Sequence, residues 1–336
     1  MKESRLFWFD NAKIFLIFCV IMGHVIARIG EGEFGKTLDS SLYFFHMPLF
    51  IFISGLFTKK RGIKRNIMSI LKLLEAYFVF EIIHILIRFF LFKDRTPFLW
   101  LLLIPQWSLW YLLSLAFWRS FVFFIKWDLS SYKFVLYSIV LGLLVGFVPI
   151  ESSLSFQRTF SLFPFFAMGY YFRQKRFNFN MIRKLPISMA IVVLVSLFCV
   201  SYFSSFPLKQ FNEGLYSYYY FDFSLVIAMG CRCMMYLVCI LASVCVLRLI
   251  PVRYIIFFSN EGSHTLLYYL YHTSLIYFLI SLKPILSLPS SFCACVIYTL
   301  IICLFIWLII QMPFFRVLPN CISNSFERIN QKREDR

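Results

Sequence analysis

Charged residues are scarce in this sequence, and their scarcity excludes a soluble protein. Asp, Glu, Lys and Arg make up only 15% of the 336 residues, whereas 61% are hydrophobic and 21% are aromatic. So few polar residues could not cover the surface of a globule of this length. Apolar runs instead recur from one end of the chain to the other. The composition therefore predicts an all-α, polytopic helical membrane protein with a single integral-membrane domain.

Several catalytic and metal-binding motifs are also absent. The sequence has no G-x-x-x-x-G-K-[ST], which excludes a P-loop ATPase, and no G-x-S-x-G, which argues against a serine hydrolase. It has no H-E-x-x-H and no acidic cluster, and the C-x-C pairs Cys231/Cys233 and Cys293/Cys295 have no His nearby. We therefore expect no metal site, and we expect the ten cysteines to act mostly as small buried hydrophobic residues.

The apolar runs predict a bundle of about ten transmembrane helices. Two of the runs are short and contain a proline, Pro48 and Pro164, which is tolerated where other helices or a cavity satisfy the freed backbone groups. We assign residues 1–320 to the membrane domain and 321–336 to a short charged cytoplasmic tail. The predicted spans are 8–28, 42–57, 73–92, 108–125, 134–150, 159–172, 187–206, 223–247, 265–282 and 292–315.

The formal net charge of +17 fits this topology better than it fits binding to nucleic acid. Lys and Arg concentrate in the cytoplasmic loops of membrane proteins. If the N-terminus is cytoplasmic, most cations fall in loops on that side, for example in 58–72 and 173–184. The charge distribution therefore predicts that both termini face the cytoplasm, in the inner (plasma) membrane. The opposite loops hold only Arg28, Lys36, Lys93, Arg95, Arg158, Lys209 and Lys283.

The first predicted span, within WFDNAKIFLIFCVIMGH, contains three ionisable residues. Lys13 and His24 are eleven residues apart, so they leave one face of a helix about 16 Å apart along its axis. Asp10 precedes Lys13 by three positions and can pair with it. Ionisable groups inside a bilayer indicate a functional site. In the alternative interpretation, Asp10 and Lys13 only extend to the cytoplasmic surface and His24 has a structural role.

A second histidine, His46 in FFHMPLFIFISG, begins the next span. A hairpin of the two spans would place His24 and His46 at similar depth in the extracytoplasmic half. Lys13 would then lie nearer the cytoplasmic side. A histidine can take a proton from a hydroxyl, and a cation at the other end would suit a long anionic substrate. Alternatively, His46 only bonds to the backbone at the start of its helix.

Four further polar residues are candidates for substrate binding. Arg119 and Arg158 would bind donor phosphates or a carbonyl oxygen, or else they anchor one helix to another. His272 and Tyr269 are three positions apart on one helix face, where they would line a site. Glu81, His84 and Arg88 also share a face, either towards a cavity or to satisfy one another.

These residues carry a resemblance to a known family. WFDNAKIFLIFCVIMGH followed by FFHMPLFIFISGLF resembles the opening of the integral-membrane acyltransferase 3 family. The hallmark of that family is Arg or Lys, ten residues, then His, which Lys13 and His24 match. Later stretches resemble its fucose 4-O-acetylase-like branch. They are LWYLLSLAFWR (109–119), RTFSLFPFFAMGYYF (158–172) and HTLLYYLYHTSL (264–275).

The resemblance implies a bundle of about ten helices that moves an acyl group, usually acetyl from acetyl-CoA, onto a hydroxyl of a cell-surface sugar. By this resemblance His24 would be the general base or a transient acyl carrier. Lys13, oriented by Asp10, would contact the anionic donor. The expected partners are acetyl-CoA as a donor substrate, a glycan or lipid-linked sugar as acceptor, and membrane lipids. No cofactor would be bound permanently.

A transporter or flippase of lipid-linked sugars or small solutes is the rival interpretation. Composition and topology fit it equally well. Transporters more often show inverted halves with matching broken helices, and no such symmetry is visible in this sequence. The spacing of Lys13 and His24, together with FHMPLF and PFFAMGYY, favours the enzyme. The presence of both residues also argues against a scaffold that has lost activity.

Overall fold

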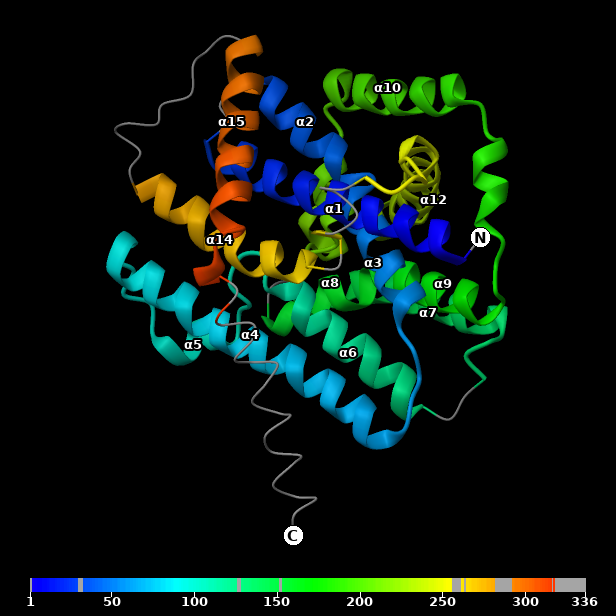
Figure 1. Cartoon of the computed structure of the whole chain (residues 1–336), viewed down its shortest axis with the longest axis horizontal. Coiled ribbons are helices and arrows are strands. Elements are labelled where there is room, and N and C mark those ends of the chain that lie inside the picture. Colours follow the sequence, from blue (N-terminus) through cyan, green and yellow to red (C-terminus); the bar gives the residue numbers. More distant parts are fainter. Residues whose placement is uncertain are drawn as a thin grey trace.

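The described part of the chain is built from helices, with no strand in it (Figure 1). The computed structural model describes residues 2–29, 33–125, 128–150, 153–255, 261–262, 264–281, 292–315 and 317, without the side chains of 2–6, 29 and 292–295. The all-α prediction is confirmed. The predicted tail 321–336 and the side chains of Cys293 and Cys295 lie outside the described residues.

The order of the elements follows the predicted spans, with several short helices added. The longer helices are α1 (Lys2–Ile29), α2 (Glu33–Tyr43), α3 (His46–Phe57), α4 (Ile63–Phe92), α6 (Trp110–Phe124), α7 (Tyr132–Leu144), α9 (Phe163–Gln174), α10 (Ile187–Phe203), α12 (Leu225–Leu249), α14 (Thr265–Ser281) and α15 (Phe292–Ile310). The shorter ones are α5 (Phe98–Leu102), α8 (Phe156–Ser161) and α11 (Leu208–Glu213), with 3-10 turns at Val145–Phe147, Ser153–Ser155, Phe179–Lys184 and Tyr218–Tyr220.

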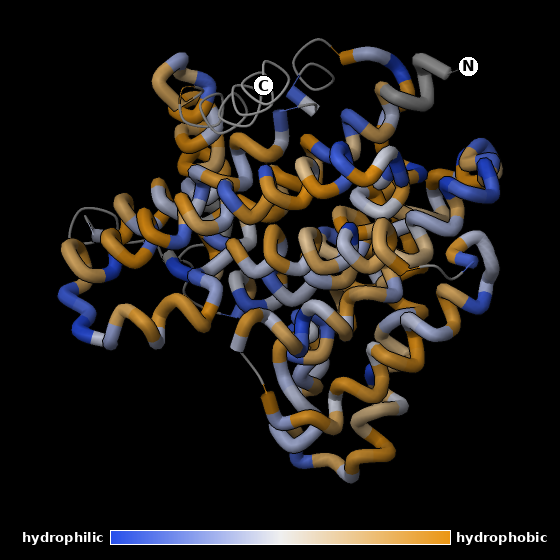
Figure 2. The backbone as a smooth tube through the Cα atoms, turned by 90° about the horizontal axis from the view of Figure 1, so that it is seen from below, coloured by the Kyte–Doolittle hydropathy of each residue, from blue (hydrophilic) through white to orange (hydrophobic). Residues whose placement is uncertain are grey.

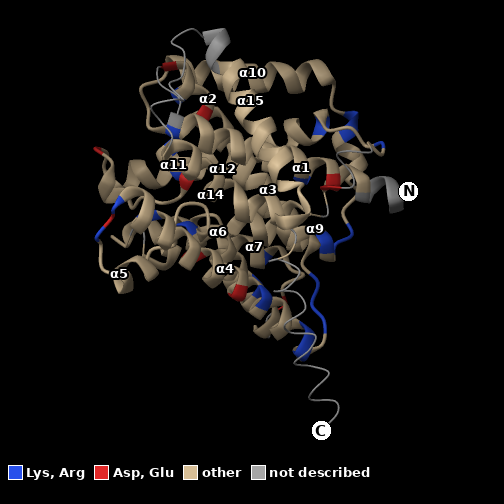
Figure 3. Ribbon diagram, turned by 60° about the vertical axis from the view of Figure 1, so that its left-hand side comes forward, with Lys and Arg blue, Asp and Glu red and all other residues tan. Residues whose placement is uncertain are grey.

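Length and hydropathy mark the molecule as a membrane protein. Within the described residues, the stretches Phe7–Arg28, Glu33–Phe57 and Leu225–Leu249 are long and apolar enough to cross a membrane. Hydrophobic residues run along most of the other helices too (Figure 2). Many Lys and Arg residues gather on the side of the molecule where the N-terminus lies (Figure 3). The count of about ten crossings stays a prediction.

The two prolines begin new helices instead of kinking one span. The predicted span 42–57 starts inside α2, and a turn at Phe44 and Phe45 separates α2 from α3. The predicted span 159–172 is likewise divided between α8 and α9. Pro48 and Pro164 each lie in the first turn of the second helix, where a missing backbone N–H leaves no hydrogen bond unmade.

Helix α3 is the buried centre of the bundle, and it packs most closely on α9. The two backbones touch at a pair of glycines. A Cβ on Gly55 would overlap the carbonyl of Phe166, and a Cβ on Gly169 would overlap the carbonyl of Phe52. Small residues allow such close approach between membrane helices. This contact fixes the direction of α3, which carries His46 at its start.

The loop between α5 and α6 is fixed by polar residues of α4. The backbone N–H of Gln106 donates to the buried carboxylate of Glu81, at 3.0 Å from Oε2. Arg88 donates to Oε1 of Gln106 at 2.5 Å and forms an ion pair with Asp94. Glu81 and Arg88 therefore form their polar contacts with this loop and not with one another. The loop leads directly into Trp107 and Ser108, which belong to the cavity described next.

Candidate functional site

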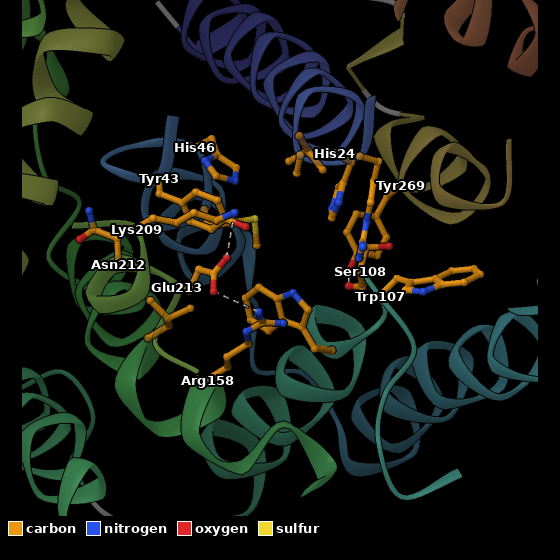
Figure 4. A pocket seen from close by; sticks show the side chains of 16 residues that line it. His24, Tyr43, His46, Trp107, Ser108, Arg158, Lys209, Asn212, Glu213 and Tyr269 are labelled. Carbon is orange, nitrogen blue, oxygen red and sulfur yellow. Dashed lines mark hydrogen bonds and ion pairs between the residues drawn. The ribbon is translucent and has the colours of Figure 1, made fainter. Parts of the chain in front are cut away.

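Two histidines predicted from the sequence line one cavity of about 270 Å³, which we call the histidine cavity (Figure 4). His24 comes from α1 and is half-buried. No described residue forms a hydrogen bond with its ring. His46 is the first residue of α3, and its Nδ1 lies 2.6 Å from the carbonyl oxygen of Leu42. His46 thus both bonds to the backbone at a helix start and lines the cavity.

Of the predicted pair Tyr269 and His272, only Tyr269 lines the histidine cavity. The hydroxyl of Tyr269 donates to the carbonyl of Ser108. His272 does not line the cavity; it is fully buried behind His24, with the two ring centroids 5.2 Å apart. A role in direct substrate contact fits Tyr269 better than His272.

Charged residues from three elements meet on the other side of the cavity. Lys209 of α11 lies 2.6 Å from the Asp39 carboxylate of α2 and 3.6 Å from Glu213. Arg158 of α8 lies 3.9 Å from Glu213, and its Nε has no partner within the described part of the chain. Burial opposes the charge of Lys209, but Asp39 and Glu213 outweigh it and raise the pKa of this ammonium group.

Aromatic rings complete the walls of the histidine cavity. The guanidinium of Arg158 lies over the Trp110 ring at 5.0 Å, and the ammonium of Lys209 lies over the Tyr43 ring at 5.4 Å. Trp107 also lines the cavity. Flat apolar faces beside hydrogen-bonding groups suit a ligand that is both polar and partly apolar.

The sequence did not single out Lys209, Asn212 or Glu213 for this cavity, nor Asp39 as the partner of Lys209. The i, i+4 spacing of Lys209 and Glu213 within LKQFNE, between two apolar runs, was the available signal. The side-chain amide nitrogen of Asn212 is buried and lacks a hydrogen-bond partner among the described residues. Nε of Arg158 is likewise buried without a partner there, so two side chains that line the cavity each carry an unsatisfied hydrogen-bond donor.

Lys13 and Asp10 do not line the histidine cavity. They form an ion pair of 2.6 Å, with 21% and 23% of their side-chain surfaces exposed. The ammonium of Lys13 lies 5.4 Å from the centre of the Phe57 ring, at the end of α3 opposite to His46. Lys13 and His24 are therefore associated with opposite ends of α3.

A second, smaller cavity of about 180 Å³ lies at that end of α3, and we call it the basic pocket. Phe57 lines it together with four cations, which are Lys59, Arg61, Arg65 and Arg119. Asn66 fixes its loop, because its side chain accepts from the N–H of Arg61 and donates to the carbonyl of Arg61, both at 2.9 Å.

Arg119, from α6, belongs to the basic pocket, whereas Arg158 belongs to the histidine cavity. Arg119 donates to Oγ of Ser69 at 3.1 Å, and its buried Nε has no partner in the described ranges. An arginine with free donors among other cations is suited to bind phosphate. No group of three metal-ligating residues occurs in the described part of the chain.

Comparison with known proteins identifies the family. The sequence model described as "Acyltransferase domain" matches residues 6–309, which include both cavities. No curated protein and no solved structure matches the chain. The match covers nearly the whole length, and the chain therefore belongs to the acyltransferase 3 family of membrane acyltransferases.

Proposed function

We propose that this protein transfers an acetyl group from acetyl-CoA to a hydroxyl of a cell-surface glycan or of its lipid-linked precursor. The observation that carries the proposal is His24 facing the histidine cavity among aromatic rings and free hydrogen-bond donors. Family membership supports acyl transfer, and the acetyl group and the glycan are our inference. Nothing in the family match or in the site supports the rival transporter.

In the proposed reaction His24 takes the proton of the acceptor hydroxyl as that oxygen attacks the thioester carbonyl. The carbon–sulfur bond then breaks, and the proton passes to the departing sulfur to give free CoA. Arg158, with its unpaired Nε, is suited to stabilise the negative charge on the carbonyl oxygen. A variant of this scheme, in which His24 carries the acyl group transiently, uses the same residues.

The basic pocket is our candidate for the phosphates of the donor. Desolvated phosphates need cationic partners, and Lys59, Arg61, Arg65 and Arg119 supply them. Lys13 lies against Phe57, which lines this pocket, and so it would stand between the phosphates and His24. The thioester arm would extend along α1 and α3 from the basic pocket to the histidine cavity.

Substitution of His24 tests this function directly. In a protein reconstituted in liposomes, His24→Ala should lower acetyl transfer by about 10²–10⁴-fold, because a general base is lost. Lys13→Arg should keep part of the activity, whereas Lys13→Ala should not. Equal insertion of all variants, checked by size-exclusion chromatography in detergent, is the control. Full transfer by well-folded His24→Ala protein would refute the proposal.

We also propose that the protein lies in the inner membrane with both termini and residues 58–72 in the cytoplasm, because Lys and Arg dominate that side. Residues 63–72 of this stretch form the start of α4 and not a loop. Lys60 and Lys36 are both exposed. A cysteine at position 36, but not one at position 60, should react with a membrane-impermeant thiol reagent in cells whose outer barrier has been removed. Labelling at position 60 but not at position 36 would show that the topology is the reverse of the one proposed.

A further inference from the structure

Three side chains, Ser108, Thr273 and His272, form a hydrogen-bonded row. The row runs from the wall of the histidine cavity to the ring of His272, which lies behind His24. Ser108 lines the cavity, and its Oγ lies 2.7 Å from Oγ1 of Thr273. Thr273 Oγ1 in turn lies 3.1 Å from Nε2 of His272. Ser108, Thr273 and His272 are all buried. The acyl transfer proposed above assigns no role to this row.

The chemistry of His272 fixes the direction of every hydrogen bond in the row. Its Nδ1 lies 3.0 and 2.8 Å from the carbonyl oxygens of Tyr268 and Tyr269. A carbonyl oxygen can only accept, so Nδ1 must carry the proton. A fully buried imidazole with no carboxylate bonded to it among the described residues is neutral, because an unpaired charge would be strongly disfavoured there. Nε2 therefore accepts a hydrogen bond.

The remaining directions follow from the number of protons. Thr273 donates its only hydroxyl proton to His272, so it must accept the proton of Ser108. Ser108 then has no proton left for the cavity and presents only lone pairs there. The nearby hydroxyl of Tyr269 is already used, since it donates to the Ser108 carbonyl.

The loop that carries Ser108 is held rigidly. Trp107 has a left-handed backbone, with φ of 51°, which a non-glycine residue keeps only where its surroundings enforce it. Its ring stacks on that of Tyr277, with centroids 3.5 Å apart, and Gln106 before it is bound by Glu81 and Arg88. The lone pairs of Ser108 therefore have a fixed position in the cavity.

We propose that Ser108 binds a neutral hydroxyl of the acceptor by accepting its hydrogen bond, and that His272 is a positioning residue that sets this polarity through Thr273. The proposal rests on the function proposed above. It also predicts selectivity: lone pairs attract an O–H group and repel a phosphate or carboxylate oxygen. This subsite therefore selects hydroxyl-bearing acceptors and rejects anionic groups at the same position.

Thr273 offers a matched pair of variants. Thr273→Val keeps the shape of the side chain but breaks the row, and Thr273→Ser keeps the hydroxyl. The probes are acetyl-CoA and a panel of neutral methyl hexosides. In Thr273→Val, KM for the hexoside should rise about tenfold, the worth of one hydrogen bond, while KM for acetyl-CoA stays unchanged. Thr273→Ser should behave like the wild type.

Two kinetic outcomes would overturn the proposal. One is an unchanged KM for the hexoside in Thr273→Val, or an equal rise of both KM values. The other is a wild type that acetylates hexoside phosphates but no neutral hexoside. A wild type that transfers no acetyl group to either class of acceptor would instead count against the proposed function.

Nuclear magnetic resonance of protein with 15N-labelled histidine tests the polarity without any substrate. The His272 signals, identified by their loss in His272→Gln, should show the proton on Nδ1 in the wild type. A proton on Nε2 would reverse the row and refute the proposal. This readout is independent of acyl transfer, so it distinguishes a failure of the hydrogen-bonded row from a failure of the proposed function.

Discussion

The histidine cavity and the basic pocket share helix α3, but their charges are arranged in opposite ways. In the histidine cavity two of the three lining cations meet an acid, as Lys209 meets Asp39 and Arg158 meets Glu213, and the third, Arg28, lies over the Tyr277 ring. Among the described residues, no acidic side chain lines the basic pocket, where the four cations stand together. Paired charges orient a neutral polar ligand without strong net attraction, whereas unpaired cations attract anions. The two sites are therefore suited to different substrates.

The separation of the two sites indicates the path of the reaction. His46 at the start of α3 lines one site, and Phe57 at its end lines the other. Twelve helical residues span about 18 Å along the axis. A donor with phosphates at one end and a thioester at the other would reach from one site to the other. This separation is compatible with the proposed placement of the donor phosphates in the basic pocket and of the acceptor in the histidine cavity.

The largest expected effect comes from disturbing the scaffold that both sites share. Gly169→Ala places a Cβ against the Phe52 carbonyl of α3, and overpacking of this kind destabilises by about 3 kcal/mol or more. Both substrates should then bind poorly, and the Tm in detergent should fall. Gly230→Ala on α12 is the control, since nothing lies within 4 Å of its new methyl group. A stable Gly169→Ala protein would contradict the α3–α9 contact.

Arg158→Met tests the histidine cavity alone. It removes the guanidinium beside Trp110 and Glu213, and so it should lower kcat by about 10²-fold if this group stabilises the oxyanion. KM for acetyl-CoA should stay near the wild-type value. Arg158→Lys keeps the positive charge but lacks the planar guanidinium, so its kcat should lie between those of the wild type and Arg158→Met. A rise in KM for acetyl-CoA, with kcat unchanged, would instead indicate that Arg158 binds the donor.

Arg119→Met is the corresponding test of the basic pocket. Loss of its unpaired Nε should raise KM for acetyl-CoA about tenfold, since hydrogen bonds to charged groups are worth about 1.5–3 kcal/mol. KM for the acceptor should not change. Ser69→Ala, which removes only the partner of Arg119, should give a smaller shift in the same direction. An equal change in both KM values would mean that the two sites are not distinct.

Most of the helices, and the meeting of His24 with His46, follow from local sequence signals. The long apolar runs predict α1 and α12, because burial in lipid depends on composition alone. A hairpin of the first two spans is enough to bring the two histidines to similar depth. The turn between α2 and α3 was missed because its Phe44 and Phe45 are as apolar as the helices around it.

The charged half of the histidine cavity could not be predicted in the same way. Lys209 and Asp39 are separated by 170 positions, and only the tertiary packing of α11 on α2 brings them together. Arg119 and Arg158 looked equivalent in the sequence, since each adjoins an aromatic-rich span. Tertiary packing places Arg158 in the histidine cavity and Arg119 in the basic pocket.

The smallest effect is the pH dependence of stability that arises from Lys209 in the histidine cavity. The double change Lys209→Met/Asp39→Asn removes both charges without leaving one unpaired. Because Asp39 and Glu213 raise the pKa of Lys209 above its unfolded value, the pair stabilises the fold below the unfolded pKa. That stability is lost as the pH rises through the folded pKa. Lys209 is partly exposed, so we expect about 1 kcal/mol or less.

The measurement is the Tm of wild type and double variant in detergent, from neutral to strongly alkaline pH. The difference between the two should be constant near neutrality and should shrink at alkaline pH, where Lys209 loses its proton. KM for acetyl-CoA at neutral pH should be equal in the two proteins, because the basic pocket lies at the other end of α3. A Tm difference that grows with alkaline pH would show that the pair does not hold α11 on α2. A changed KM for acetyl-CoA would show that the charges of the histidine cavity reach the donor.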